Sequence, residues 1–488
     1  MTASAPRTVA HDDRSSGPTG GIDRGTVLAM VLGSILNPVN SSMLTVALVP
    51  VARGFHTTPA QTAWLVSGLY LATAIGQPVF GRVVDIIGPR TPYLLGAALT
   101  GAASLFGALA PNLPLLVLSR ILLGLGTSAA YPAAMALVRR QADASDHDDA
   151  RRPTTILAIL TASSQVVAVL GPTVGGLLIS AGGWRLIWAV NLPLVAACLT
   201  LGARRLPRYP RPAAPDPIDV RGVALFSATL TLFMLFLMDP TSGHWYLPVL
   251  AAAVGTAFTV TSLRTAHPFL DLRVLAGNVP LLATYVRQFL AYLSTYAFLY
   301  GFTQWAQASH GLSAAEAGLL LLPLSAAALA ATAATGRHPT AFGKLVVGSV
   351  LQILGAGILL TLGATTPAVL LVAVGVVMGI PQGINGLGNQ NALYVQGDAA
   401  RMGASAGLLR TFMYVGALTA ASANAACFRH GATTSGLHQL AWLLLGASTA
   451  LLVMSVADKS LRGVGRQAWR GPASSLGLGW GGGPTGRR

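Results

Sequence analysis

Charged side chains are scarce in this sequence. Of its 488 residues, 9% are Asp, Glu, Lys or Arg, whereas a soluble globular protein carries about 25%. Hydrophobic residues make up 53% of the chain, and the mean hydropathy is +0.62. So few charges cannot cover a water-exposed surface, which excludes a soluble enzyme. Because disordered chains are poor in apolar residues, a disordered protein is excluded too. We therefore expect most of the chain to face lipid.

Cysteine is also scarce, and metal-binding patterns are missing. Cys198 and Cys427 are the two cysteines, and both lie inside apolar runs, so the sequence offers no disulfide framework. It contains no H-E-x-x-H motif and no cluster of Cys and His. A membrane enzyme would need a nucleophile with its base, or metal ligands, at lipid depth. The sequence therefore argues against an enzyme and predicts neither a metal nor a cofactor.

Long apolar stretches dominate what is present. From residue 25 they follow one another in lengths of about 20 residues, enough to cross a ~30 Å hydrocarbon core as a helix. Their lack of an alternating pattern favours helices over a barrel. We predict an all-α integral membrane protein with fourteen transmembrane helices, at 26–51, 61–82, 91–110, 114–138, 154–180, 184–203, 221–239, 244–264, 279–304, 313–335, 342–363, 367–394, 402–427 and 437–457.

The basic residues indicate the orientation of these spans. The net charge is +16, and arginines gather in loops on one side, at 139, 140, 151 and 152 after the fourth span and at 204, 205, 208 and 211 after the sixth. By the positive-inside rule, both termini are expected in the cytoplasm of a multi-pass protein of the cell membrane. Six tryptophans then fall near outer span ends, as an interfacial belt predicts. This topology accounts for the positive charge without a nucleic-acid partner.

The spans divide into two sets of six. A Pro- and Arg-rich segment that cannot continue a helix separates them, and two further spans joined by a tight turn follow it. Six plus two plus six suggests two bundles with a substrate site between them near the bilayer midplane. The predicted domains are a disordered cytoplasmic tail (1–24), an N-terminal six-helix bundle (25–203), a cytoplasmic linker (204–220), an inserted transmembrane hairpin (221–264), a C-terminal six-helix bundle (265–457) and a second disordered cytoplasmic tail (458–488).

Four short motifs occur in order along the first half. Gly81, Asp85, Gly88 and Arg90 follow the second span, where the glycines permit a tight turn and the carboxylate can brace neighbouring helix ends. The fourth span contains Arg120 and then Gly124. The fifth contains Gly171-Pro172-Thr173-Val174-Gly175-Gly176, and the sixth begins Trp184-Arg185-Leu186-Ile187-Trp188-Ala189-Val190-Asn191-Leu192-Pro193.

These motifs resemble those of the major facilitator superfamily. With fourteen spans, the chain is similar to the multidrug efflux branch of drug:proton antiporters, whose members give antibiotic resistance. The resemblance implies the major facilitator fold, with two six-helix bundles plus an inserted two-helix hairpin. It also implies a secondary active transporter that works by alternating access and exports small organic compounds or drugs in exchange for protons. We expect the protein to act as a monomer in the lipid bilayer.

One of the departures from this branch bears on proton coupling. Its members commonly have an acidic residue in the first span, where this sequence has Asn40. An amide can bond to substrate but cannot take up and release a proton near neutral pH. The candidate proton sites are then Asp85, Asp239 and Glu316, unless coupling to protons is absent. Asp85 is expected at the rim of the membrane, where a gating role is favoured over proton transfer.

Three arginines lie inside predicted spans, namely Arg120, Arg287 and Arg410, with no carboxylate at comparable depth. Ionisable groups in a span are costly and are functional candidates by default. Arg120 could donate to backbone carbonyls of the first span or bind substrate, and the other two could extend toward the interface. Three buried cations without partner acids favour an anionic substrate. A carrier of an anionic metabolite that is not coupled to protons is therefore the alternative function, and a non-transporting membrane sensor is a third.

Uncharged polar residues complete the predicted substrate path. In the twelfth span the spacing of Gln382, Asn385 and Asn389 places three amides on one helical face. In hydrocarbon such a stripe must face a wet cavity or bond to another helix. The predicted path comprises Asn40, Arg120, Gln165, Arg287, Gln382, Asn385, Asn389 and Arg410. The motif residues Gly171, Pro172, Gly175 and Gly176 are expected to allow close packing and bending, or to contact the substrate.

Overall fold

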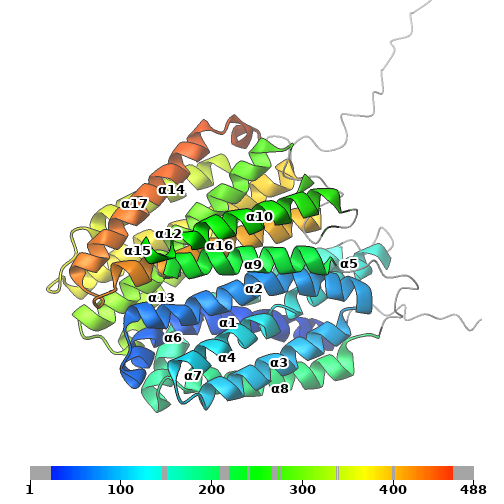
Figure 1. Cartoon of the computed structure of the whole chain (residues 1–488), viewed down its shortest axis with the longest axis horizontal. Helices are drawn as coiled ribbons and strands as arrows, with labels where there is room; N and C mark the ends of the chain where they lie inside the picture. Colours follow the sequence, from blue (N-terminus) through cyan, green and yellow to red (C-terminus); the bar gives the residue numbers. More distant parts are fainter. Residues whose placement is uncertain are drawn as a thin grey trace, which may run out of the picture.

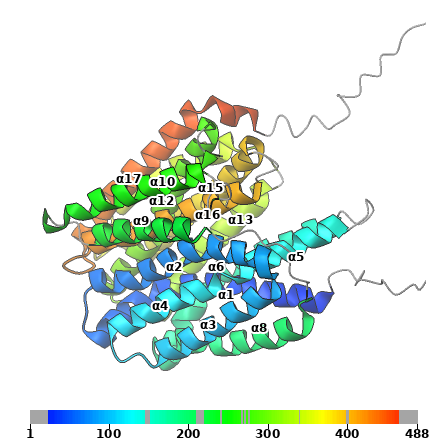
Figure 2. The ribbon, with the colours of Figure 1, turned by 45° about the vertical axis from the view of Figure 1, so that its right-hand side comes forward.

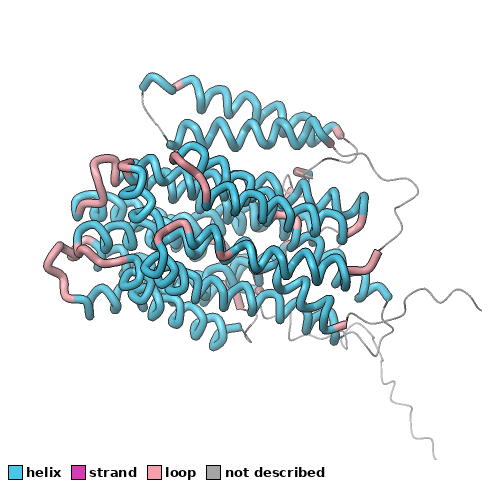
Figure 3. The backbone as a smooth tube through the Cα atoms, turned by 90° about the horizontal axis from the view of Figure 1, so that it is seen from below, coloured by secondary structure: helices cyan, strands magenta, loops and turns pink. Residues whose placement is uncertain are grey.

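The computed structural model describes residues 23–144, 151–208, 219–238, 242–265, 268, 272–273, 277–336, 338, 340–397 and 402–464. Throughout these residues the chain forms helices joined by short connections, and no strand occurs among them (Figure 3). The first half contains α1 (Arg24–Phe55), α2 (Pro59–Ile87), α3 (Arg90–Ala108), α4 (Leu113–Thr127), α5 (Ala130–Ala144), α6 (Arg151–Gly182), α7 (Leu186–Ala189) and α8 (Asn191–Arg205).

The inserted hairpin and the second half follow. The hairpin is α9 (Val220–Met238) and α10 (Tyr246–Arg264), with a 3-10 turn η2 (Ser242–His244) between them. The second half contains α12 (Val279–Ser309), α13 (Ala314–Gly336), α14 (Phe342–Leu359), α15 (Ala368–Gln396), α16 (Met402–Cys427), α17 (Thr434–Ala457) and the short 3-10 helix η4 (Lys459–Gly463).

Each predicted span coincides with a helix or a pair of consecutive helices in the described residues. Ten of these helical segments are long and apolar enough to cross a membrane by length and composition. The fourth span is interrupted between Thr127 and Ala130, and the sixth is divided at Val190. The all-α membrane fold predicted from the sequence is confirmed.

Side-chain caps fix where several helices begin. The Asp23 carboxylate accepts from the Thr26 amide at 2.9 Å to start α1. Thr58 and Gln61 form a reciprocal capping box at the start of α2, and Asn112 and Asn278 cap α4 and α12. Such caps satisfy amide groups that the first helical turn leaves without partners. The polar residues between the apolar runs therefore set the helix boundaries.

The helices form two halves that lie side by side (Figure 1). In the N-terminal half α1 packs on α6 and α8, and in the C-terminal half α12 packs on α16 and α17, and α13 on α15. The halves meet along two seams, α2 against α16 and α6 against α13, with α1 near α12 between them. The hairpin contacts α2 and α16 through α9 and therefore covers the first seam (Figure 2).

The two ends of the bundle differ in what they carry. The start of α1 and the end of α17 lie toward the same end, which we name the termini end (Figure 2). The opposite end, named the far end, carries the α1–α2 and α16–α17 turns. There a cavity of about 330 Å³ lies between the halves, lined by Leu48, Val49, Ala52, Arg53, His56, Thr57, Pro59, Thr62, Gln304, Ala308, Gly431 and Ala432.

Candidate functional site

The motif after the second span forms the turn between α2 and α3. Gly88 ends α2 with φ 83°, a left-handed value that favours glycine, and its amide donates to Val84 O at 2.9 Å. Arg90 donates to the backbone carbonyl of Ala203 at the end of α8. Among the described residues, no atom lies within 4 Å of a β-carbon placed on Gly81. The turn is therefore fastened to α8 through Arg90.

The glycines of α6 allow a close crossing with α1. A β-carbon at Gly171 would collide with the Ser42 side chain, and one at Gly175 would lie 3.0 Å from the β-carbon of Met43. Pro172 lies inside the helix, where it removes one backbone hydrogen bond. Small residues at these positions let two backbones approach each other in a membrane.

The next glycine pair closes the seam between the halves. A β-carbon at Gly176 of α6 would overlap the Ala314 carbonyl of α13, and one at Gly318 would lie 2.5 Å from Pro172 O. The Thr173 hydroxyl donates to Gly318 O at 3.0 Å. The α6 motif thus forms a contact between the halves toward the far end.

Arg120 braces the interior of the N-terminal half. Its side chain is 1% exposed, and it donates through Nη2 to Asn40 O at 2.9 Å and through Nε to Leu65 O at 3.4 Å. Its guanidinium lies 5.6 Å from the centre of the Trp188 ring. These contacts join α4 to α1, α2 and α7. Donation to a backbone carbonyl of the first span is one of the two roles expected from the sequence.

Asn40 is bonded within the same half rather than free. Its Nδ2 donates to Asn191 Oδ1 at 2.8 Å and to Leu36 O at 2.8 Å, while Asn191 Nδ2 donates back to Asn40 Oδ1 at 2.9 Å. Both amides are buried. The pair joins α1 to α8, and the Asn40 side chain has its donors and its acceptor occupied.

Arg287 forms a buried ion pair, which corrects the expectation that the intramembrane arginines lack partner acids. Its Nη1 lies 2.7 Å from Asp458 Oδ2, with side-chain exposures of 0% for Arg287 and 13% for Asp458. Its Nη2 donates to Thr284 Oγ1, while its buried Nε has no hydrogen-bond partner among the described residues. The acid was missed because Asp458 follows the last predicted span and was assigned to the tail. Residues 459–463 of that segment form η4.

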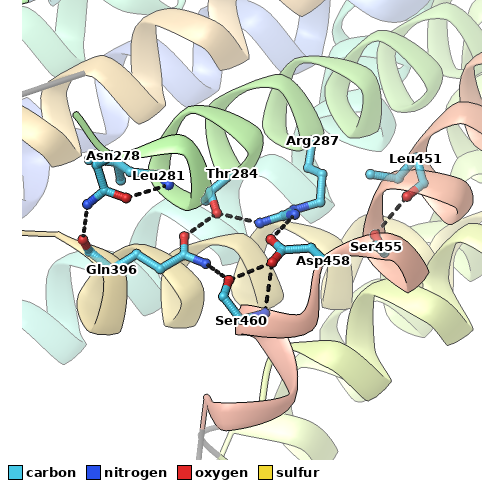
Figure 4. Close-up of polar contacts among 9 residues, drawn as sticks. All are labelled: Asn278, Leu281, Thr284, Arg287, Gln396, Leu451, Ser455, Asp458 and Ser460. Atoms are coloured by element: carbon cyan, nitrogen blue, oxygen red, sulfur yellow. Dashed lines mark hydrogen bonds and ion pairs between the residues drawn. The ribbon is translucent and has the colours of Figure 1, made fainter. Parts of the chain in front are cut away.

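A polar network surrounds this pair at the termini end (Figure 4). Ser460 donates from its amide at 2.9 Å and from its hydroxyl at 2.6 Å to Asp458 Oδ1. Gln396, at the end of α15, donates to Ser460 Oγ at 2.9 Å and accepts from Thr284 Oγ1. Asn278 donates to Gln396 O at 2.7 Å. The network ties the ends of α12, α15 and α17 together.

The charge state of Asp458 follows from these contacts. Partial burial acts to raise the pKa of Asp458, but the hydrogen bonds from Ser460 and Arg287, together with the Arg287 charge, outweigh it. The pKa of Asp458 therefore lies below its ordinary value, and the carboxylate is ionised at neutral pH.

Arg410 reaches across the seam between the halves. Its guanidinium carbon lies 3.5 Å from the centre of the Tyr131 ring of α5. Close by on the same seam, Gln77 Nε2 of α2 donates to the Tyr414 hydroxyl of α16 at 2.9 Å. A guanidinium over an aromatic face is held by the electrostatic attraction of the ring. Arg410 is thus half-buried between the halves rather than extended to the membrane surface.

The amides of α15 divide between the two expected roles. Asn385 donates to Gln352 Oε1 at 3.2 Å, and Asn389 donates to Gln288 Oε1 at 3.0 Å, so these two bond to other helices of the C-terminal half. The Oδ1 atoms of both asparagines are buried, and neither accepts a hydrogen bond from a group in the described part of the chain. Gln382, in contrast, lines a cavity of about 30 Å³ between α6, α13 and α15.

The candidate proton sites are not brought together. Glu316 is exposed and accepts from the amide and the hydroxyl of Ser313, both at 2.8 Å, which caps α13. Asp239 and the side chains of Asp85 and Gln165 lie outside the described part of the structure. Among the described residues, no group of three or more His, Cys, Asp and Glu side chains is placed to hold a metal ion.

The sequence reasoning missed a group of tyrosines on the seam. We define the tyrosine cluster as Tyr70 of α2, Tyr292, Tyr296 and Tyr300 of α12, and Tyr414 of α16. The three tyrosines of α12 recur every fourth residue, which places them on one face along about 12 Å of helix. That spacing could have indicated a row of tyrosines on α12. It could not have indicated Tyr70 and Tyr414, because they come from helices far from α12 in the sequence.

Contacts within the tyrosine cluster join the two halves. The hydroxyls of Tyr70 and Tyr300 lie 3.0 Å apart. The Tyr70 ring lies 5.3 Å from that of Tyr296 and 5.9 Å from that of Tyr414, between ring centres. Tyr296 also stacks with Tyr300 at 5.8 Å. The seam near mid-depth is therefore aromatic and hydroxylated, and it can offer both ring faces and hydrogen-bonding groups to an organic molecule.

Most of this chain is similar in sequence to known membrane transporters. A sequence profile of the Major Facilitator Superfamily matches residues 30–421. The uncharacterized MFS-type transporter YwoD of Bacillus subtilis is 29% identical over 447 residues, which cover 89% of this chain and 96% of that protein. The tetracenomycin C resistance and export protein of Streptomyces glaucescens is 27% identical over 428 residues, covering 85% and 77%.

A solved structure shares the fold. A crystal structure of a mutant of the nucleoside transporter NupG aligns with a TM-score of 0.61 at 13% sequence identity, covering 88% of this chain and 99% of the other. At this identity the likeness concerns the arrangement of helices alone.

Proposed function

This chain belongs to the Major Facilitator Superfamily, and from that premise we propose that it exports small organic compounds by alternating access. It is a multi-span membrane transporter and not an enzyme. The observation that carries the export proposal is the similarity, over most of the chain, to a protein named for resistance and export. We further propose that it resides in the cell membrane with the termini end in the cytoplasm, as the arginine-rich loops favour.

Contacts between the halves at different depths support alternating access. Toward the far end, Thr173 bonds to Gly318 O, and Gln307 Nε2 donates to Val46 O at 3.4 Å. Toward the termini end, Gln77 bonds to Tyr414, and Arg410 covers Tyr131. In a rocking motion of the halves about a central site, contacts at one end must separate while those at the other persist. Tyr414 of the second set belongs to the tyrosine cluster, whose α12 rings extend from Tyr292 to Tyr300 in the direction of the far end.

The family resemblance implies that export occurs in exchange for protons, and this exchange forms part of the proposal.

A second candidate function is favoured by one observation. Helices α12 and α16 contain no Asp or Glu, and α2 contains Asp85 alone, near its termini end. A carrier of anions needs no proton site in the seam, because an inside-negative potential drives an anion outward with ~2.3 kcal/mol per charge and 100 mV. The second candidate is therefore a carrier of an anionic compound that is not coupled to protons.

Accumulation of a fluorescent compound in an efflux-deficient bacterial host tests export. Cells that express the wild type are expected to retain less dye than cells that express Gly176→Leu, because the added side chain collides with α13. Gly357→Leu is the matched control, since no atom of the described residues lies within 4 Å of a β-carbon at that position. Equal retention by all three, at equal membrane expression, would contradict export. Purified protein that binds a compound without moving it across a membrane would favour the alternative of a non-transporting membrane sensor.

Reconstituted vesicles separate the two energy sources. With a pH gradient and no potential, proton exchange predicts uphill movement that collapses when the gradient is dissipated. With a potential and no pH gradient, the anion carrier predicts movement toward the positive side. Movement that responds to neither gradient would contradict both.

A further inference from the structure

The tyrosine cluster has a chemical character that bears on the substrate, and the inference drawn from it rests on the proposed transport function. Tyr70 belongs to the N-terminal half, whereas the other four rings belong to the C-terminal half. When the halves separate, the face between Tyr70 and the α12 rings opens. A ligand bound there would take the place of contacts that now join the halves.

The spacing of the rings fits flat molecules. Tyr70 meets Tyr296 edge to face at an interplanar angle of 60°, while Tyr296 and Tyr300 are nearly parallel at 17°. Tyr292 extends this row, with its ring centre 5.9 Å from that of Tyr296. Offset stacking and edge-to-face contact are the arrangements in which aromatic rings attract one another. An aromatic ligand that displaces Tyr70 can form the same contacts with the row on α12.

The hydroxyls of the cluster supply hydrogen bonds that a ligand can replace. Tyr70 and Tyr300 bond to each other, and Tyr414 accepts from Gln77. Each of these bonds crosses the seam and is lost when the halves separate, which frees phenol O–H donors and an amide donor. Such donors suit the oxygens of a carbonyl, phenolate or carboxylate.

The charge around the cluster is positive. The guanidinium of Arg410 interacts electrostatically with Tyr292 and Tyr414, and that of Arg120 interacts with Tyr70 and Tyr300. The described contacts of both arginines are with carbonyls and rings rather than carboxylates. Ring faces alone would attract a cation. A positive charge about 10 Å from a ligand, at an effective dielectric constant of about 20, favours an anion over a cation by more than ~10-fold.

We propose that the tyrosine cluster binds flat aromatic compounds that carry a carboxylate or an ionised phenol, in preference to cationic aromatic compounds of the same shape. Arg410 sets this preference, while the α12 row sets the preference for flat rings.

Two dyes with the same three-ring core test the proposal. The purified full chain in lipid nanodiscs is titrated into fluorescein, an anion, and rhodamine 123, a cation, and binding is followed by fluorescence anisotropy. Fluorescein is expected to bind at least ~10-fold more tightly. Equal binding, or tighter binding of rhodamine 123, would overturn the proposal.

Substitutions assign the preference to residues. Arg410→Gln is expected to reduce the fluorescein-to-rhodamine affinity ratio at least ~5-fold, while Arg410→Lys keeps it, because the charge remains. Tyr296→Leu should weaken the binding of both dyes by the same factor and leave the fluorescein-to-rhodamine affinity ratio unchanged. Arg185→Gln is the matched control, since Arg185 also covers a ring, that of Trp184 at 4.2 Å, but at the far end. An unchanged ratio in Arg410→Gln, or an equal loss in Arg185→Gln, would overturn the role of Arg410.

The failure of this inference is distinguishable from failure of the proposed function. Charge-selective binding of fluorescein that is sensitive to Arg410, without movement of any compound across a vesicle membrane, would sustain the site and refute transport. Transport of the dyes with a charge preference unaffected by Arg410 would sustain transport and overturn the assignment of the site.

Discussion

The two halves fasten their first helix to their last helix at different depths. In the N-terminal half, α1 is held to α8 near mid-depth by the reciprocal amide bonds of Asn40 and Asn191, at 2.8 and 2.9 Å. At the termini end the same two helices share the ion pair of Asp23 and Arg205, at 3.2 Å, with side-chain exposures of 48% and 55%. The strong tie of this half is thus internal and uncharged.

The C-terminal half has the opposite arrangement. Near mid-depth, α12 and α17 share the weak contact of Ser294 with Ser448, at 3.4 Å between hydroxyl oxygens. At the termini end they share the buried pair of Arg287 and Asp458. The polarity is also reversed, because the acid Asp23 precedes the first helix in one half, whereas the acid Asp458 follows the last helix in the other. Solvent weakens the exposed pair, whereas burial makes either partner of the other pair costly to remove.

The largest effect is expected when the buried pair is broken. Asp458→Asn leaves the Arg287 charge buried without a partner, which should lower the free energy of unfolding by about 3 to 5 kcal/mol. Asp23→Asn, at the equivalent tie of the other half, should cost less than ~1 kcal/mol. Unfolding of both variants in detergent, followed by tryptophan fluorescence, measures the difference. The double variant Arg287→Met with Asp458→Leu should recover most of the loss. Equal destabilisation by the two single variants would contradict the comparison.

An intermediate effect is expected at the amide pair. Asn191→Leu removes both bonds to Asn40 and leaves a buried oxygen unbonded, at a cost of about 1 to 3 kcal/mol. Ser448→Ala, at the corresponding depth of the other half, should change stability by less than ~1 kcal/mol, since the contact it removes is long. The double variant Asn40→Leu with Asn191→Leu should be more stable than Asn191→Leu alone. A larger loss of stability in Ser448→Ala than in Asn191→Leu would contradict the claim that the Asn40–Asn191 contact is the stronger of the two mid-depth contacts.

The smallest effect concerns pH. A carboxyl with a pKa depressed by folding stabilises the fold above its unfolded pKa, ~3.9 for Asp, and this contribution is lost as the pH falls through the folded value. The pKa of Asp458 is depressed, as described above. The stability difference between the wild type and Asp458→Asn should therefore shrink below about pH 4, by at most ~1.4 kcal/mol per pH unit. Unfolding measured between pH 3 and 7 tests this. A difference that grows on acidification would mean that folding raises the pKa of Asp458 above its unfolded value instead of lowering it.

Asp23 is the control for that measurement. Hydrogen bonds from Thr26, with a smaller contribution from the charge of Arg205, hold the pKa of Asp23 below its ordinary value. Because Asp23 and Arg205 are both about half exposed, solvent screening should keep the pH dependence of the Asp23→Asn difference smaller than that of Asp458→Asn.

Much of the fold could be predicted from the sequence because helices in lipid satisfy their own backbone groups. The length of each apolar run therefore located a helix without knowledge of its neighbours, as α9 and α10 show. The spacing of Gln382, Asn385 and Asn389 predicted a shared face, but it could not predict that Asn385 bonds to α14, that Asn389 bonds to α12 and that Gln382 lines a cavity beside α6 and α13. The breaks after Thr127 and at Val190 were missed, because both occur within continuous apolar sequence.

The partners of the site residues could not be predicted in the same way. Arg287 and Asp458 are separated by 171 positions and Asn40 and Asn191 by 151. Asp458 was also hidden by its place after the last apolar run, in sequence that resembles a tail. Polar side chains give no signal of which distant group satisfies them, since many pairings are compatible with the same helices.

The sequence by itself determined the helices, their order and the family to which the chain belongs, because these depend on local hydrophobicity and short motifs. Only the tertiary structure decided that Tyr70, Tyr300 and Tyr414 share one seam, and that Asp458 neutralises Arg287. Those outcomes depend on which faces of distant helices pack together. Packing in a membrane is selected by small residues and polar contacts summed over the whole bundle, and no single segment carries that information.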